Sequence, residues 1–225
     1  MPKTKVVEGA NALDGVCAGM TIAVGGFADF GAPMRLLDLL WRKNIGGLNL
    51  IGQDAGVKND RGVARLIHEG RVAKLTAAHI GLNPEAGELM HKGSLQVELL
   101  PLGNLMEGLR CAGDGLGGVL TPTGIGTVVA EGHQIITVGG RPFILQEPIR
   151  ADIALVKAWK ADIYGNLLYR RSTRNCNPVI AAAAELVIVE ADEIVPPGSF
   201  DPDEVVTPFI LTDRIICSSE DMYYE

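Results

Sequence analysis

Residues 21–33 read Thr21-Ile22-Ala23-Val24-Gly25-Gly26-Phe27-Ala28-Asp29-Phe30-Gly31-Ala32-Pro33. The first four residues are apolar or β-branched, which predicts a short buried strand that ends at two glycines. Proline is common in the first turn of a helix, and Leu36, Leu37 and Leu40 then recur at helical spacing. The stretch therefore predicts a strand, a tight glycine loop and a helix, which is how a parallel βαβ unit begins.

The same alternation continues along the chain. We expect further strands at 48–52, 72–78, 95–100, 153–159 and 186–189, and helices at 63–69, 84–91, 104–111 and 178–185. A hairpin is expected at 134–145, with its turn at Gly139-Gly140. Short apolar strands that alternate with helices indicate a parallel sheet covered on both faces. We predict one α/β domain over residues 1–225, with an open, mostly parallel sheet, flanking helices and a β-rich insertion.

Composition excludes several classes of protein. The net charge of −7 argues against a nucleic-acid partner. No run reaches the roughly 18 apolar residues of a membrane span, and the first residues lack the apolar core of a secretory signal. The four cysteines, Cys17, Cys111, Cys176 and Cys217, have neither metal-site nor disulfide spacing. We therefore expect a cytoplasmic protein without a metal site, in which each cysteine is a small buried side chain.

Charge is unevenly distributed along the second half. Residues 150–174 hold six basic side chains against Asp152 and Asp162; the six are Arg150, Lys157, Lys160, Arg170, Arg171 and Arg174. Residues 185–225 hold eleven acidic side chains against Arg214. Two interpretations stay open: two solvated faces, or a basic surface for an anionic ligand beside an acidic rim. In the second case one or more of Lys157, Lys160, Arg170, Arg171 and Arg174 would face the ligand or a partner.

The glycine loop is the main candidate for ligand binding. In open parallel sheets ligands bind beyond the carboxyl ends of the strands. Glycines allow a close approach of the backbone, and free amides at a helix start can donate to an anion or a carbonyl oxygen. A tight turn without a ligand fits the same residues. The candidate binding residues are Gly25, Gly26, Phe27, Ala28, Asp29, Phe30 and Gly31.

A second glycine-rich run does not predict a dinucleotide site. Gly113, Gly115 and Gly118 match the pattern GxGxxG. The run follows a helical stretch rather than a strand, and Pro122 and Gly124 prevent the helix that should come next. NAD binding is therefore rejected.

The motifs together resemble a known family. Gly25-Gly26-Phe27, three variable residues and Gly31-Ala32-Pro33 resemble the N-terminal signature of α-type chains of family I CoA transferases. Thr121-Pro122-Thr123-Gly124-Ile125-Gly126-Thr127 is similar to a second segment of these chains, and matches at Arg174-Asn175 and Thr207-Pro208 extend the resemblance over nearly the whole chain. Residues 78–85 are similar to the acetate/acetoacetate type rather than the 3-oxoadipate type.

This resemblance implies a function. An α subunit of this family helps to move CoA between a short-chain acyl-CoA or acetoacetyl-CoA and acetate or another short-chain carboxylate, by a ping-pong mechanism. The CoA thioester is the substrate, no cofactor is required, and the attacking glutamate lies on a β subunit, in an α2β2 hetero-oligomer. Since Asp29 would repel phosphates, the loop is expected to face the pantetheine arm or the thioester.

No catalytic residue is assigned to this chain. Ala130-Glu131-Gly132 lacks the polar residue of the family's glutamate motif, and Glu190, Asp192 and Glu193 are interpreted as a surface acidic turn. Two alternatives stay open: an isomerase of related fold that acts on a sugar phosphate, and a non-catalytic acyl-CoA sensor. The sequence of a neighbouring reading frame would discriminate between them.

Overall fold

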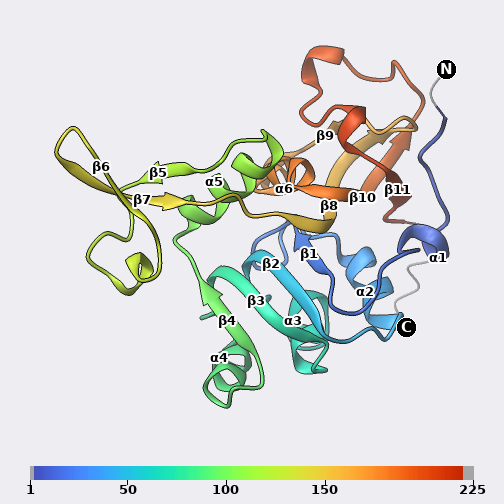
Figure 1. Ribbon diagram of the computed structural model, residues 1–225. Helices are drawn as coiled ribbons and strands as arrows, with labels where there is room; N and C mark the ends of the chain where they lie inside the picture. Colours follow the sequence, from blue (N-terminus) through green and yellow to red (C-terminus); the bar gives the residue numbers. More distant parts are fainter. Residues whose placement is uncertain (1–2, 220–225) are drawn as a thin grey trace.

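The computed structural model describes residues 3–219 and shows an α/β fold with one large sheet (Figure 1). The strands of this sheet are β1 (Thr21–Val24), β2 (Leu48–Asp54), β3 (Val72–His79), β4 (Gln96–Leu99), β8 (Ala151–Asp162), β9 (Leu167–Leu168), β10 (Ala184–Val195) and β11 (Arg214–Cys217). The α-helices are α1 (Gly9–Ala12), α2 (Met34–Arg42), α3 (Gly62–His68), α4 (Pro84–His91), α5 (Leu102–Gly113) and α6 (Asn177–Ala182). Short 3-10 helices are η1 (Val128–Ala130), η2 (Arg171–Arg174), η3 (Pro202–Glu204) and η4 (Phe209–Leu211).

The order of the strands reverses beside β1. Across the sheet the order is β11-β10-β8-β1-β2-β3-β4, and these seven strands run parallel, while β9 pairs antiparallel with β8. In register, Ile22 of β1 lies between Leu50 of β2 and Ile153 of β8. The chain leaves β1 toward β2, β3 and β4, and later returns to build outward from β8. The gap between β1 and β8 is thus the topological switch point, where open α/β sheets bind their ligands.

Helices cover both faces of the sheet. Ile22 and Val24 belong to one buried cluster, with side chains from α1, α2, α3 and α4. Ala23 points to the opposite face, into a cluster with side chains from α5 and α6. This alternation is what period-2 strands impose when both faces are buried.

Most predicted elements are confirmed. The strand at 21–24 and the helix at 84–91 coincide with β1 and α4, and the expected hairpin is formed by β6 (Ile135–Val138) and β7 (Arg141–Gln146). The helix predicted at 178–185 is wrong at its end, because α6 stops at Ala182 and β10 begins at Ala184. Pairing with Ala151 of the long strand β8 places Ala184 in the sheet.

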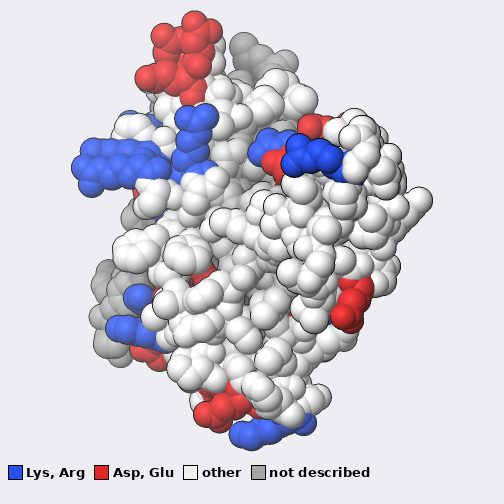
Figure 2. Space-filling model, turned by 90° about the vertical axis from the view of Figure 1, so that its left-hand side faces the viewer, with Lys and Arg blue, Asp and Glu red and all other residues white. Residues whose placement is uncertain are grey.

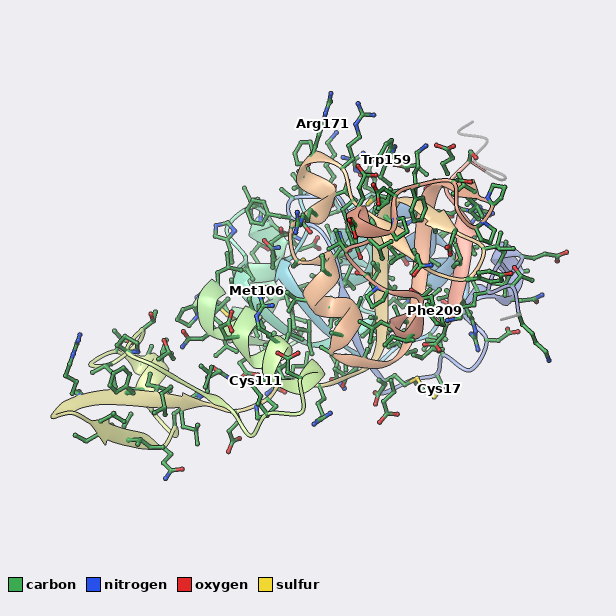
Figure 3. The ribbon with its side chains drawn as sticks, turned by 90° about the horizontal axis from the view of Figure 1, so that it is seen from above. Cys17, Met106, Cys111, Trp159, Arg171 and Phe209 are labelled. Carbon is green, nitrogen blue, oxygen red and sulfur yellow. The ribbon has the colours of Figure 1, made fainter. Side chains whose placement is uncertain are left out.

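The β-rich insertion is an arm that projects from the body (Figures 1 and 3). Its antiparallel sheet has the order β5-β7-β6, with β5 at Val119–Thr121. Ile144 is its fully buried apolar side chain, whereas Val128 is 77% exposed. Across residues 3–219, none of the helices has the length and apolarity that crossing a membrane requires.

Candidate functional site

The glycine loop connects β1 to α2 and lies at the switch point of the sheet. Phe27 and Phe30 exchange two backbone hydrogen bonds, of 3.0 and 2.8 Å. Ala28 and Asp29 between them have φ values of 49° and 69°. Two central residues with positive φ are the hallmark of a type I′ turn, which usually contains Asn or Gly. The loop is therefore a two-residue hairpin held in a backbone conformation that costs Ala28 about 1 kcal/mol.

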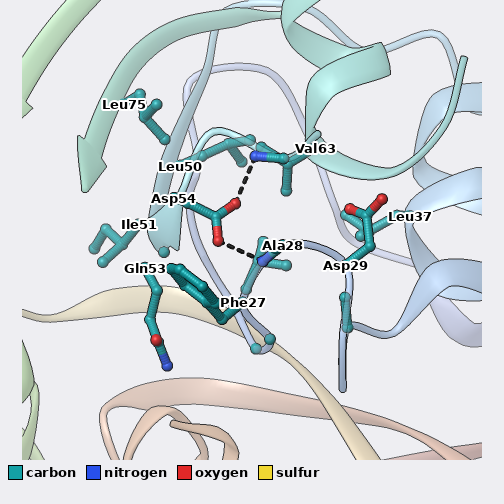
Figure 4. Close-up of a pocket in the computed structure, with 16 residues that line it drawn as sticks. Phe27, Ala28, Asp29, Leu37, Leu50, Ile51, Gln53, Asp54, Val63 and Leu75 are labelled. Carbon is teal, nitrogen blue, oxygen red and sulfur yellow. Dashed lines mark hydrogen bonds between the residues drawn. The ribbon is translucent and has the colours of Figure 1, made fainter. Parts of the chain in front are cut away.

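Asp54, at the end of β2, holds this turn in place. Its buried carboxylate accepts hydrogen bonds from the amide of Ala28, at 2.6 Å, and from the amide of Gly56, at 2.6 Å (Figure 4). Both donors are backbone groups that have no other acceptor within residues 3–219. The contact ties the loop after β1 to the carboxyl end of the neighbouring strand.

Asp29 is turned inward rather than toward solvent. Its side chain is 10% exposed and accepts a hydrogen bond from Arg61 Nε at 3.1 Å. Burial raises the pKa of the Asp29 carboxyl above its ordinary value of 3.8, and the Arg61 guanidinium acts in the opposite direction. The negative charge is thus paired and partly hidden, so it presents less repulsion to an anionic ligand than the sequence suggested.

Glycine is required by the loop itself at two positions. Gly26 has φ 109°, and a β-carbon there would lie 2.8 Å from the backbone nitrogen of Ala32. Gly31 has φ 68°, and a β-carbon there would lie 2.9 Å from Thr173 Cα in η2. The packing of the chain against itself therefore explains these glycines.

The amides at the start of α2 are not free. Glu190 of β10 accepts hydrogen bonds on Oε2 from the amides of Arg35, at 2.8 Å, and Leu36, at 3.1 Å. The expectation that the helix start could donate to a ligand is therefore wrong for these two amides. In the loop, over the residues that the structure describes, the amide of Gly26 is buried beside the Cys176 thiol, whereas the amides of Asp29 and Gly31 make no hydrogen bond. These two amides remain available to an acceptor.

Glu190 also departs from its interpretation as part of a surface acidic turn. It is 3% exposed. Lys157 Nζ donates to its Oε1 at 2.9 Å, and Ser218 Oγ donates to the same oxygen at 3.1 Å. Both carboxylate oxygens are thus occupied. Asp192 and Glu193 lie at the surface as expected, but they belong to strand β10 rather than to a turn.

A pocket lies beneath the loop, between β1, β2 and α3 (Figure 4). Asp54 and Asp29 are at its polar end. Its apolar lining includes Leu37, Leu50, Val63 and Leu75.

The basic stretch divides into paired lysines and unpaired arginines. Lys157 forms ion pairs with Glu190 and Asp192, and Lys160 pairs with Glu193 at 2.8 Å, so the arginines remain the basic residues of this stretch that are open to a ligand or a partner. Arg170, Arg171 and Arg174, here called the arginine cluster, are exposed and form no ion pair within residues 3–219.

The arginine cluster lies against the glycine loop. Asn175 Nδ2 donates to the carbonyl of Phe30 at 3.1 Å, and Asn177 Nδ2 donates to the carbonyl of Gly31 at 2.9 Å. Arg170 stacks 5.2 Å from the centroid of the Trp159 ring, and Figure 3 shows Arg171 at the same end of the molecule. The segment from η2 to the start of α6 therefore borders the switch point, on the other side of the glycine loop from α2.

The four cysteines differ in how far they are buried. Cys111 and Cys176 are buried as expected, and burial raises the pKa of both thiols. Cys17 is exposed and Cys217 is partly exposed, so the expectation of a buried side chain is wrong for Cys17.

Comparisons with known proteins agree with the geometry. The family model described as Coenzyme A transferase matches residues 9–218. The chain is 48% identical to Acetate CoA-transferase subunit alpha of Escherichia coli K12, over 97% of this chain and 99% of that protein. It is 39% identical to the Acetoacetyl-CoA:acetate/butyrate CoA transferase alpha subunit of Clostridium acetobutylicum, over 95% of this chain and 97% of that protein.

A solved structure shares the fold. The acyl-CoA transferase of Escherichia coli O157:H7, in a thioester complex with CoA, superimposes with a TM-score of 0.83 at 22% identity. The match covers 96% of this chain and 47% of that one, so the chain spans about half the length of that transferase. The family model and the identities extend over nearly the full length, and the chain therefore belongs to the coenzyme A transferase family.

Proposed function

We propose that this chain is the α subunit of a CoA transferase that moves CoA between a short-chain acyl-CoA, or acetoacetyl-CoA, and acetate or another short-chain carboxylate. The observation that carries the proposal is the loop at the switch point, with two backbone amides left unbonded at Asp29 and Gly31 among the described residues. The names of the relatives, an acetate transferase and an acetoacetyl-CoA:acetate/butyrate transferase, support this substrate class.

The chain's contribution is to bind and orient the CoA thioester. Backbone amides suit the carbonyl oxygen of a thioester, which gains negative charge when it is attacked. The exposed arginine cluster suits the phosphate groups of CoA, because guanidinium groups bind phosphate bidentately.

The nucleophile is proposed to come from a β subunit. A glutamate carboxylate of that partner attacks the acyl-CoA carbonyl, which gives a mixed anhydride and releases the CoA thiolate. The thiolate then attacks the glutamyl carbonyl, which gives a glutamyl-CoA thioester and releases the carboxylate; the second acid reverses these steps. Glu190 cannot play this part, since it is buried and both of its oxygens accept hydrogen bonds.

The arm is the surface proposed for the β subunit. Figure 2 shows the molecule from this side, with most of the face uncharged and with separate groups of Lys and Arg side chains at the upper left, the upper centre, the left side and the lower edge. Exposed apolar side chains here are Leu116, Leu120, Val128, Ile135 and Val138. Stable interfaces are depleted of charge at their centre, and a permanent complex of this kind buries about 2,000 Å² or more.

The test is reconstitution followed by trapping. Each subunit alone is expected to be inactive with acetoacetyl-CoA and acetate, and the mixed subunits active. Borohydride reduction of the complex after incubation with acyl-CoA, followed by mass spectrometry, should place the modified glutamate on the β subunit. A label on Glu131 or any other residue of this chain would overturn the proposed division of labour.

A further inference from the structure

A buried ion pair behind the glycine loop has no place in the chemistry above. Lys157 and Glu190 are directly opposite each other on β8 and β10, with side chains 12% and 4% exposed. Burying two charges carries a desolvation cost that a stability role alone does not justify, since apolar residues would pack there at less expense. The hydrogen bonds of Glu190 and Lys157 show which backbone segments this ion pair holds in place.

Glu190 caps α2 from another element. The residue at the N-cap position of α2 is Pro33, whose side chain makes no capping hydrogen bond. The amides of Arg35 and Leu36 would then lack partners in a buried region, and Glu190 Oε2 satisfies both. The carboxylate also carries the charge that the positive end of the helix dipole favours.

Lys157 connects the cap to the far end of the loop. Its ammonium group donates to Glu190 Oε1, and its backbone amide donates to Asn177 Oδ1 at 2.9 Å. Asn177 in turn donates to the carbonyl of Gly31 at 2.9 Å. One residue of β8 thus contacts both supports of the segment from Gly31 to Leu36.

We propose that Glu190 and Lys157 are positioning residues, which fix the glycine loop by holding the start of α2 against the sheet. They touch neither substrate nor reacting atoms; they set where the loop amides stand. Their relevance to CoA transfer rests on the proposed function, whereas their effect on the loop can be measured without it.

The variants follow from the hydrogen-bond chemistry. In Glu190→Gln the amide group cannot serve both sides: if its oxygen accepts from α2, its NH2 group faces the Lys157 ammonium. In the double variant Lys157→Met/Glu190→Gln that ammonium is gone, so the oxygen can return to the helix amides. The matched control is Glu193→Gln, because Glu193 and Lys160 pair between the same two strands but at the surface, with side chains 53% and 25% exposed.

The primary measurement is amide hydrogen exchange in the native chain. We expect Glu190→Gln to speed exchange at Arg35 and Leu36 by roughly tenfold or more, because their opening no longer requires breaking the charged cap. Glu193→Gln should leave these amides unchanged, and the double variant should restore part of the protection. A merely structural role would speed exchange across the whole sheet instead.

The second measurement is turnover of the complex with its partner. We expect Glu190→Gln to lower kcat by roughly tenfold to a hundredfold with KM for acyl-CoA little changed, because small misplacements of positioning groups have effects of that size. Glu193→Gln should turn over like wild type. Unchanged exchange at Arg35 and Leu36 would overturn the proposal, as would faster exchange with an unchanged kcat. A wild-type complex inactive with every acyl-CoA would overturn the proposed function, and the exchange data would still decide whether the pair positions the loop.

Discussion

Asn177 Oδ1 lies 1.8 Å from the point at which a β-carbon on Gly25 would stand. Asn177 is fully buried, and its Nδ2 donates to the carbonyls of Gly31 and Thr173, at 2.9 and 2.8 Å. The side chain therefore cannot rotate away without losing these hydrogen bonds and the one that its Oδ1 accepts from the Lys157 amide. The first glycine of the loop is fixed by a side chain that arrives from α6, 152 positions later in the chain.

Gly25→Ala should destabilise the fold. The added methyl group overlaps the Asn177 amide, and we expect a loss of about 3 kcal/mol in the free energy of unfolding. Urea denaturation measures it. Gly87→Ala is the matched control, because Gly87 lies within α4 with no atom within 4 Å of its β-carbon position. That variant should gain about 0.5–1 kcal/mol. Equal effects of the two substitutions would show that Asn177 yields easily.

Asp29→Asn should change how stability depends on pH. Burial raises the pKa of Asp29 above 3.8, so in the pH range just above that value the folded state binds more protons than the unfolded state. This group therefore makes stability fall as pH rises through its folded pKa. We expect the free energy of unfolding of the variant, relative to wild type, to increase as pH rises from about 3.8 toward neutrality. A constant difference across urea titrations at several pH values would contradict this.

The arginine cluster should govern attraction of CoA. In Arg171→Gln/Arg174→Gln we expect the KM for acyl-CoA to rise roughly tenfold, the size of one lost charge-assisted hydrogen bond, and its salt dependence to weaken. Lys160→Gln is the control, since Lys160 already pairs with Glu193. Measuring the KM of the complex for acyl-CoA at two ionic strengths gives both the rise in KM and the change in its salt dependence. If both variants shift KM equally, the cluster has no special role.

Thiol labelling should distinguish the cysteines. Iodoacetamide at pH 8 is expected to modify Cys17 rapidly, while Cys111 and Cys176 react only on unfolding, because burial both shields these two thiols and raises their pKa. Mass spectrometry of the native chain over time provides the measurement. Early modification of Cys176 would mean that the α6 end of the site opens readily.

The bounds of strands and helices were predicted best where the local sequence pattern and the tertiary environment favour the same structure. The strand at 21–24 and the helix at 84–91 are bounded by glycine and proline, and the structure keeps both boundaries. The long strands β8 and β10 were predicted too short, because Lys160 ends the apolar run of β8 and Glu190 ends that of β10. Both charges stay in the sheet because each is paired in register with an opposite charge on the other strand, Lys160 with Glu193 and Glu190 with Lys157, which neither segment reveals alone.

The glycine loop was identified from its residues, but its supports were not. Asp54, Asn177 and Glu190 hold the loop from three different elements, and Glu190 is separated from Arg35 by 155 positions. Single-sequence reasoning assigned Glu190 to the surface, because a carboxylate is seldom buried without partners. Two of its partners are backbone amides, which leave no mark in the sequence, and the other two, Lys157 and Ser218, come from different strands and loops of the chain.

The arm has a consequence for the life of the chain in a cell. With Ile144 as its fully buried apolar side chain and Val128 largely exposed, this three-stranded sheet has little of the packed hydrophobic face that independent stability requires. A newly made chain that has not met its partner would present the arm to chaperones and proteases. Copies of this chain made in excess of the partner subunit would then be degraded first. The amount of assembled complex would be set by whichever of the two subunits is made in the smaller amount.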